Sequence, residues 1–255
     1  MTAENKEALR KKWQEEEQRP FAGWDFSEFE GRWEEESVTW DYDALIRRYA
    51  KRDGMLLDMD TGGGERLLTL NHPHHLTAVT EGYDPNLALC REKLAPLGIT
   101  VKAARADGKL DFADDTFQTV LNRHGDFDPR EVFRVLRPGG GIFITQQVGC
   151  MNNRELSRKL IPGFQPPFPH HDLVHNVAAL KRAGLRILMA DECFPRLRFL
   201  DTGAVCRYAK IMEWECPGFT VDGCLDALLD IHDQIETKGG YSCTQHRFMI
   251  VAVKE

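Results

Sequence analysis

Three features of the sequence predict a doubly wound α/β fold, in which parallel strands alternate with helices. A short apolar strand at residues 55–57 runs into the glycine turn Gly62–Gly64, and a helical segment follows the turn. A β-branched run at residues 76–80 reads as the next strand and ends at Glu81. Strand and helix segments continue to alternate as far as residue 149. This order predicts a ligand corner where the first strand meets the glycine turn.

Each later element has its own local signal. Asp84 is expected to cap a helix that has Pro85 at its first position. Residues 99–103 are expected to form the third strand, the segment 110–122 to contain the fourth, and residues 142–145 the fifth. The remaining expected elements are a helix opening at residues 152–156, an amphipathic helix over 172–183, strands at 185–189 and 248–253, and two helices within 200–236 separated by Cys216–Gly218.

The spacing of the glycines separates two classes of nucleotide site. A nicotinamide or flavin site normally has G-x-G-x-x-G, whereas Leu67 occupies the third glycine position counted from Gly62. A nicotinamide oxidoreductase is therefore disfavoured. The acidic Asp58 followed by G-x-G resembles motif I of the class I S-adenosylmethionine-dependent methyltransferases. The whole segment 55–149, with its L-R-P-G-G turn at residues 136–140, is similar to that family and to its type 11-like domains.

The resemblance implies a seven-stranded, mostly parallel Rossmann-like methyltransferase sheet with an antiparallel last strand, and S-adenosylmethionine as cofactor. It implies that Asp58 and Gly62–Gly64 contact the methionine half of the cofactor and that Glu81 contacts the ribose. Asp107 would accept from the adenine amine, and the end of the fourth strand would face the methyl group. The full set of expected cofactor residues is Asp58, Asp60, Gly62, Gly63, Gly64, Glu81, Gly82, Asp107, Gly108, Asn122, Arg123, His124 and Tyr42.

The sequence departs from the family pattern at two positions. Asp60 replaces the first glycine of motif I, and Gln118 replaces the aspartate that usually precedes the fourth strand. Asp60 could pair with the ammonium group of the cofactor, or it could indicate a weakened site. Single positions also have structural interpretations: Asp107 could cap a turn, and Asn122 could be a solvated strand end.

Residues 1–50 differ in character from the predicted domain at 51–255. They combine a charged helical stretch with seven aromatic residues between positions 21 and 42, and we expect them to form a lid over the strand ends or simply to pack as a core extension. Trp40 and Tyr42 are the favoured ligand neighbours because they precede the first strand. Within the domain, residues 55–149 form the cofactor half and 150–247 the substrate side. The aromatic residues are Phe21, Trp24, Phe26, Phe29, Trp33, Trp40 and Tyr42.

No catalytic dyad is evident, because methyl transfer from a sulfonium mainly needs alignment of the acceptor. His124 and His170 are candidate bases. His171 and His175 would share a helix face if that helix started early enough, but two histidines without a third ligand make a metal site improbable.

The charge and composition of the chain narrow the chemical class of the acceptor. The net charge is −7, and residues 1–50 hold eight Lys or Arg against thirteen Asp or Glu, a balance that disfavours a phosphate backbone. We expect a small-molecule acceptor, with RNA or protein as alternatives, and a catalytically inactive binding paralogue as a further one. Seven cysteines without C-x-x-C spacing, no apolar run long enough for a membrane span and no signal-peptide pattern favour a cytoplasmic protein. The oligomeric state stays open.

Overall fold

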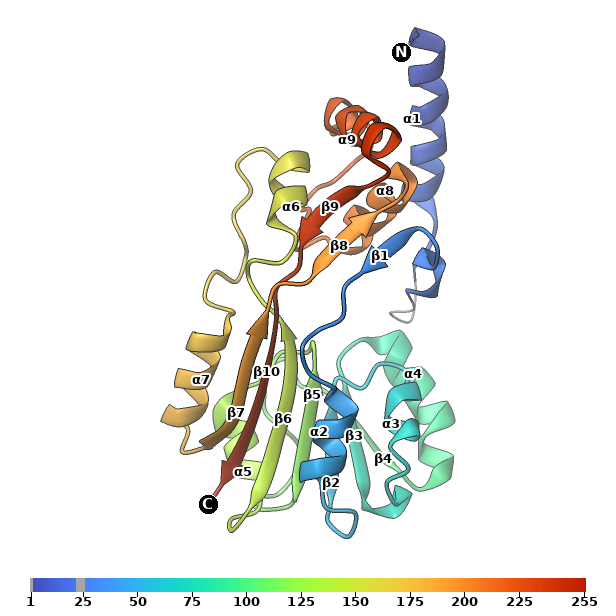
Figure 1. Cartoon of the computed structure of the whole chain (residues 1–255). Helices are drawn as coiled ribbons and strands as arrows, with labels where there is room; N and C mark the ends of the chain where they lie inside the picture. Colours follow the sequence, from blue (N-terminus) through green and yellow to red (C-terminus); the bar gives the residue numbers. More distant parts are fainter. Residues whose placement is uncertain (1, 22–25) are drawn as a thin grey trace. The chain divides into compact units, whose positions relative to one another are not determined.

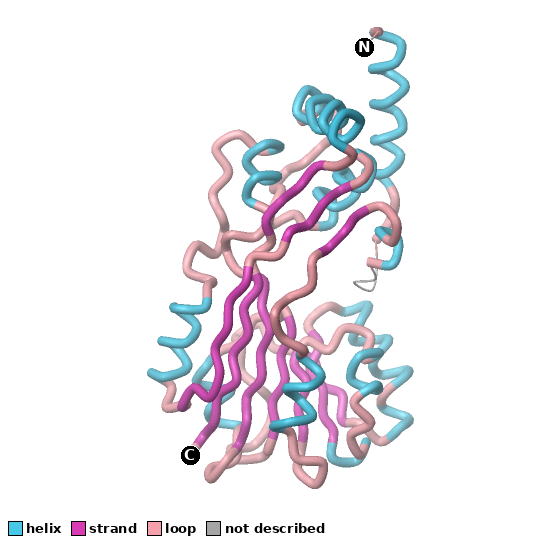
Figure 2. The backbone as a smooth tube through the Cα atoms, in the orientation of Figure 1, coloured by secondary structure: helices cyan, strands magenta, loops and turns pink. Residues whose placement is uncertain are grey.

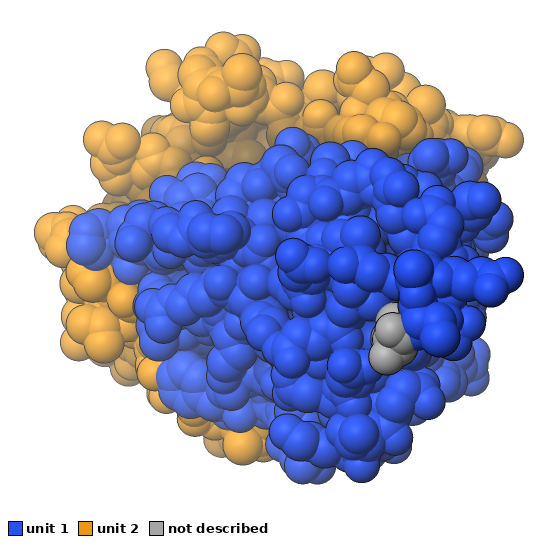
Figure 3. Space-filling view, turned by 90° about the horizontal axis from the view of Figure 1, so that it is seen from above, with its two compact units in different colours: residues 1–38, 150–170, 193–246 blue, residues 39–149, 171–192, 247–255 orange. Residues whose placement is uncertain are grey.

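The computed structural model describes residues 2–21 and 26–255, which form two compact units. Figure 3 colours unit 1 blue and unit 2 orange. Unit 1 combines residues 1–38, 150–170 and 193–246, and unit 2 combines residues 39–149, 171–192 and 247–255.

Unit 2 is built on a seven-stranded sheet with the order β4-β3-β2-β5-β6-β10-β7 (Figure 1). Strands β4, β3, β2, β5 and β6 pair in parallel, whereas β10 pairs antiparallel with β6. This is the predicted Rossmann-like methyltransferase sheet, so the fold prediction is confirmed. The strands are β2 (Leu56–Met59), β3 (Thr77–Glu81), β4 (Thr100–Ala103), β5 (Thr119–Arg123), β6 (Gly141–Val148), β7 (Arg186–Cys193) and β10 (Arg247–Lys254).

Helices cover both faces of this sheet, with α2 in front and α5 behind in Figure 1. Helix α2 packs against β6, α4 packs against β3 and β4, and α7 packs against β10 and α5. The core on the α5 and α7 side includes the fully buried Phe117, Val120, Phe143 and Phe248. The helices are α2 (Tyr42–Tyr49), α3 (Glu65–Thr69), α4 (Asp84–Lys93), α5 (Pro129–Val135) and α7 (Leu173–Arg182), with short 3₁₀ turns at η2 (His74–Leu76) and η3 (Ala95–Leu97).

One local prediction is wrong, and one condition set in the sequence analysis is not met. Asp84 is the first residue of α4 rather than its cap; the capping position belongs to Tyr83, which makes no side-chain capping bond. Helix α7 starts at Leu173, so His171 precedes the helix and does not share a face with His175. The helix starts there because the Asp172 carboxylate accepts the backbone N–H of His175, which fixes Asp172 as the cap.

Unit 1 has its own three-stranded antiparallel sheet, which the sequence analysis did not predict. Its order is β1-β8-β9, and the backbone trace in Figure 2 shows the three strands together. Helix α1 packs against α8 around the fully buried Trp13, while α6 packs against β9 and α9. The elements are α1 (Ala3–Gln18), η1 (Ser27–Phe29), β1 (Trp33–Glu35), α6 (Arg154–Leu160), β8 (Arg196–Phe199), α8 (Thr202–Ile211), α9 (Leu225–Lys238) and β9 (Tyr241–Thr244).

The amino-terminal segment is divided between the two units. Residues up to Val38 cluster with unit 1, whereas the sheet unit begins at Thr39 and includes α2. The boundary between the compact units thus lies between residues 38 and 39, and the division of the chain into a lid at 1–50 and a domain at 51–255 stays a prediction. The proposed role of residues 1–50 as a lid stays a prediction, and Trp24 lies outside the described residues.

Candidate functional site

The glycine turn connects β2 to α3 and holds the backbone in conformations that favour glycine. Gly62 and Gly64 have φ angles of +66° and +80°. A Cβ on Gly64 would lie 2.7 Å from a methyl carbon of Leu94, so the turn also packs closely against the end of α4. The predicted strand–turn–helix corner is present.

The turn is fastened to the next strand by a buried carboxylate. Glu81, at the end of β3, accepts the backbone N–H of Gly62 at 2.7 Å and that of Tyr83 at 2.8 Å. Its side chain is only 5% exposed, so both oxygens are used to hold backbone near the carboxyl ends of β2 and β3. Glu81 therefore fixes the shape of the loop on which a ligand would lie.

Asp58 is the second predicted carboxylate at this edge. Its Oδ2 atom accepts the Thr61 hydroxyl at 2.6 Å. Burial raises the pKa of Asp58 to about 6, against the opposing effects of the Thr61 hydrogen bond and of the Arg66 and Arg123 cations. The β2 end thus carries a carboxylate that is ionised at neutral pH in a poorly hydrated position.

Asp60 is placed differently from the other two acids. It has a φ angle of +53°, so it adopts a left-handed conformation that favours glycine. Its carboxylate lies between two glycines: a Cβ on Gly125 would be 2.2 Å from Oδ2, and one on Gly82 would be 3.8 Å from Oδ1. Burial, followed by the charges of Glu81, Asp58 and Asp126, raises the pKa of Asp60 to about 6.

The end of β5 contributes positive charge to the same edge. Desolvation lowers the pKa of Arg123, and the neighbouring Arg66 cation adds to this effect. Tyr42 of α2 is buried, and its hydroxyl donates to the Asn122 carbonyl at 3.4 Å, while Arg66 lies 5.2 Å from the centre of its ring. Helix α2 is thereby placed against the ends of β5 and α3.

His124 follows β5 in a left-handed conformation, with a φ angle of +67°. Its side chain is exposed to solvent, yet desolvation by surrounding protein and then the cations Arg123, Arg247 and Arg66 hold its pKa well below the usual range. His124 is therefore neutral at pH 7, which leaves it able to accept a proton although only as a weak base.

Asn122 belongs to a buried polar network rather than to a solvated strand end. Its Oδ1 atom accepts from Thr145 and Gln147, and Gln147 also donates to the Gly125 carbonyl at 3.0 Å. Its Nδ2 atom is buried without a hydrogen-bond partner. The network places Asn122 inside the sheet and holds the Gly125 loop. The sequence analysis missed Thr145 and Gln147, although two glutamines within an apolar strand were a signal.

The remaining predicted residues lie in two other places. Asp107, in the loop after β4 with Gly108, is exposed and pairs with Arg105 at 2.9 Å, which lowers its pKa. Gln118 precedes β5, at the opposite edge of the sheet from Asp60, and donates to the Gly140 carbonyl at 2.7 Å. Of the two departures, only Asp60 lies at the carboxyl edge of the sheet, next to the glycine turn.

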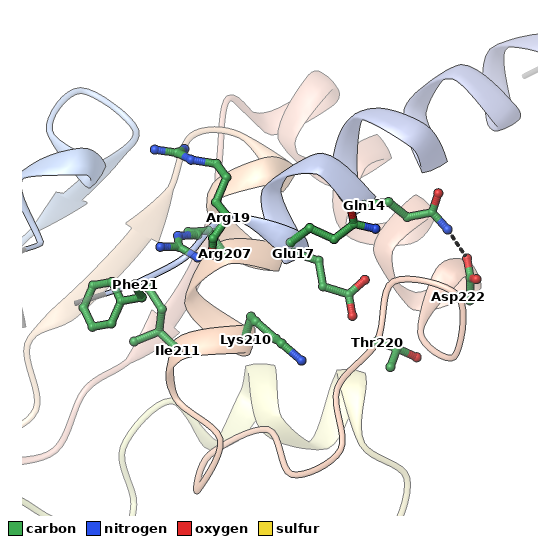
Figure 4. Close-up of a pocket in the computed structure, with 10 residues that line it drawn as sticks. Gln14, Glu17, Arg19, Phe21, Arg207, Lys210, Ile211, Thr220 and Asp222 are labelled. Atoms are coloured by element: carbon green, nitrogen blue, oxygen red, sulfur yellow. Dashed lines mark hydrogen bonds between the residues drawn. The ribbon is translucent and has the colours of Figure 1, made fainter.

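Unit 1 contains His170 and a hollow of its own. The hollow, shown in Figure 4, has a volume of about 650 Å³ and lies between α1, α8 and the loop at residues 220–222. Its charged lining is largely internally paired: Arg207 donates to Glu28 and to two backbone carbonyls, and Asp222 accepts from Arg10 and Gln14. In the described part of the chain, no group of three or more His, Cys, Asp or Glu could hold a metal ion, and no helix is long and apolar enough to cross a membrane.

Comparison with known proteins identifies the fold. No protein-family model matches the chain, and no curated protein matches its sequence. Among solved structures, a protein from Bacillus halodurans C-125 described as a "putative methyltransferase" superposes with a TM-score of 0.55 at 15% identity, over 84% of this chain and 98% of that one. The YcgJ protein of Bacillus subtilis gives 0.55 at 14% identity, over 84% and 97% of the two chains.

A protein of unassigned function from Deinococcus radiodurans R1 gives a TM-score of 0.54 at 14% identity, over 88% of this chain and 92% of that one. At these identities the similarity is one of fold. Together with the strand order and the antiparallel β10, it establishes that the chain has the Rossmann-like fold of the class I methyltransferases.

Proposed function

We propose that this protein binds S-adenosylmethionine and transfers its methyl group to a small-molecule acceptor. The observation that carries the proposal is the carboxyl edge of β2, β3 and β5. A left-handed glycine turn, the unpaired carboxylate of Asp60 and the unpaired guanidinium of Arg123 lie along this edge, where parallel sheets bind nucleotides.

The charges of this edge fit the cofactor. Among the described residues, neither the Asp60 carboxylate nor the Arg123 guanidinium has a hydrogen-bond or ion-pair partner. The methionine half of S-adenosylmethionine carries two cationic groups and one carboxylate, which are complementary to such a pair. Gly82 and Gly125 leave the space beside Asp60 free of Cβ atoms.

Each residue of the edge has a defined task in this proposal. When bound, the cofactor supplies an electrophilic methyl group on a sulfonium. Asp58 and Gly62–Gly64 bind its methionine half, Glu81 orients the loop and the ribose, and Asp107 with Gly108 contacts the adenine. Asn122 and His124 line the end of β5, where an acceptor must be aligned.

Recognition of the acceptor is assigned to the parts of the chain outside the cofactor half. His124 is neutral at pH 7 and serves as a base only for an acceptor that loses its proton easily. His170 remains a second candidate. The net charge of −7 favours a metabolite over an RNA, and residues 150–247 are proposed to select it.

Binding and transfer test the proposal separately. Isothermal titration calorimetry with S-adenosylmethionine and S-adenosylhomocysteine should give saturable heats, and a labelled methyl group should move from the cofactor to a small molecule in a metabolite extract. The absence of heat and of thermal shift with both compounds would refute the proposal. Binding without turnover across metabolite, RNA and protein acceptors would instead indicate a regulatory binding protein.

A further inference from the structure

Asp60 differs from the other acids of the site in having no partner. The Asp58 carboxylate accepts the Thr61 hydroxyl, and the two oxygens of Glu81 accept two backbone N–H groups. Within the described residues, the Asp60 carboxylate has no hydrogen bond and no ion pair. The charged groups that act on the Asp60 carboxylate are Glu81, Asp58 and Asp126, and all three are acidic. A half-buried carboxylate in such surroundings is stabilised by an added cation.

The position of Asp60 is central along the edge of the sheet. One oxygen faces Gly82, just after β3, and the other faces Gly125, just after β5, on the two sides of β2. A ligand that extends from Glu81 toward the end of β5 must pass over Asp60. In S-adenosylmethionine, the sulfonium joins the adenosine to the amino-acid half and is therefore the middle of the molecule.

We propose that Asp60 faces the sulfonium and makes this site prefer the charged methyl donor to its neutral product. The inference rests on the proposed function and adds a selectivity to it. S-adenosylhomocysteine keeps the ammonium and carboxylate groups but has a neutral thioether in place of the sulfonium. With this product bound, Asp60 again lacks a counter-charge, so the product is held less tightly than the donor.

The opposite effect is expected if Asp60 is only an obstruction. A side chain in place of glycine fills part of the ligand space, and its removal would then strengthen the binding of donor and product alike. The sign of the change in affinity therefore separates the two interpretations.

Calorimetry on the full-length protein tests the inference with Asp60→Asn and Asp60→Gly. Asparagine keeps the size of the side chain and tolerates the left-handed conformation, while glycine restores the family residue. The control is Asp53→Asn, which removes one charge from the exposed loop before β2, at the other edge of the sheet. The probes are S-adenosylmethionine and S-adenosylhomocysteine.

We expect Asp60→Asn to lower the affinity for the donor about ten-fold and to change the affinity for the product by less than about two-fold. Asp53→Asn should leave both affinities unchanged. An unchanged ratio of the two affinities in Asp60→Asn, including an equal loss of both, would overturn the inference, as would tighter donor binding in either Asp60 variant. In those cases the wild type still binds, so the proposed function stands; a wild type that binds neither compound refutes that function instead.

Discussion

Gly125→Ala examines the geometry that brings Asp60 into the site. An added Cβ would lie 2.2 Å from Asp60 Oδ2, 2.7 Å from its Cβ and 2.8 Å from its Cγ. Rotation about χ1 moves the carboxylate but not the Asp60 Cβ, so the loop after β5 or the end of β2 must also shift. Overpacking of this kind costs about 1–3 kcal/mol. We expect this loss in the free energy of unfolding, together with a loss of cofactor affinity of at least about ten-fold.

The assay is chemical denaturation combined with calorimetry, and two further variants make it specific. Gly82→Ala is the matched control, because its Cβ would lie 3.5 Å from Ala104 Cβ and 3.8 Å from Asp60 Oδ1, which are ordinary contacts. Adding Asp60→Gly to Gly125→Ala should recover most of the lost stability, since the clashing atoms are gone. Equal losses in the two alanine variants, or no recovery in the double variant, would refute the placement of Asp60 against Gly125.

Three other predictions concern charges of the same edge. Glu81→Gln leaves one of two backbone N–H groups without an acceptor, so denaturation should show a loss of about 1–3 kcal/mol, against little change for the exposed Glu65→Gln. If Arg123 binds the amino-acid carboxylate of the cofactor, Arg123→Met should weaken the binding of S-adenosylmethionine about ten-fold in calorimetry. The same variant should spare the binding of 5′-methylthioadenosine, which has no such carboxylate; equal losses for the two compounds would contradict this contact. Burial raises the pKa of Asp60 to about 6 in the folded state. Between about pH 4 and 6 the folded state therefore keeps a proton on Asp60 that the unfolded state has released. The contribution of Asp60 to the free energy of unfolding thus falls as the pH rises through this window. Asp60→Asn should therefore exceed the wild type by about 1–3 kcal/mol at pH 7, and this advantage should shrink toward pH 4; an advantage that grows in acid would disprove the assignment.

The cofactor half of the fold was predictable because its signals are local. Strands β2, β3 and β6 are almost entirely buried and rich in apolar or β-branched residues, and each is bounded by glycine, proline or a cap. The expected strand at residues 76–80 appears as Thr77–Glu81, and the one at 248–253 as Arg247–Lys254. The rules of parallel α/β topology then order these strands without knowledge of side-chain contacts.

The sheet of unit 1 was not predictable, because its strands have no clear local signal. Strand β1 has three residues and β8 and β9 have four each, and Trp33 pairs with Phe199, which in turn pairs with Tyr241. The alternation in Tyr241–Thr244 is present but too short to separate a strand from a loop. Only the partner strands, more than a hundred residues away for β1, decide the structure.

At the site, the sequence identified residue types better than it identified their surroundings. Asp58, Glu81 and the glycine turn are at the expected edge, since strand ends are readable from sequence. The two departures from the family pattern looked equivalent, yet the structure separates them: Gln118 donates to the Gly140 carbonyl at the amino edge of the sheet, whereas Asp60 lies at the carboxyl edge, against Gly125. Gly125 had no signal, because its value depends on Asp60, 65 positions earlier in the chain.

The backbone conformation and the surroundings of Asp60 both make an aspartate at this position costly to the stability of the protein. A left-handed φ angle, a raised pKa and three acidic neighbours each disfavour an aspartate here in the absence of a ligand. Glycine would relieve all three, and asparagine would relieve the charge while tolerating the backbone. Since neither neutral residue stands at this position, the structure favours a role that depends on the negative charge itself. The unpaired Arg123 at the end of β5 supplies the opposite charge at the same edge, and the two together match a zwitterionic ligand better than a neutral or purely anionic one.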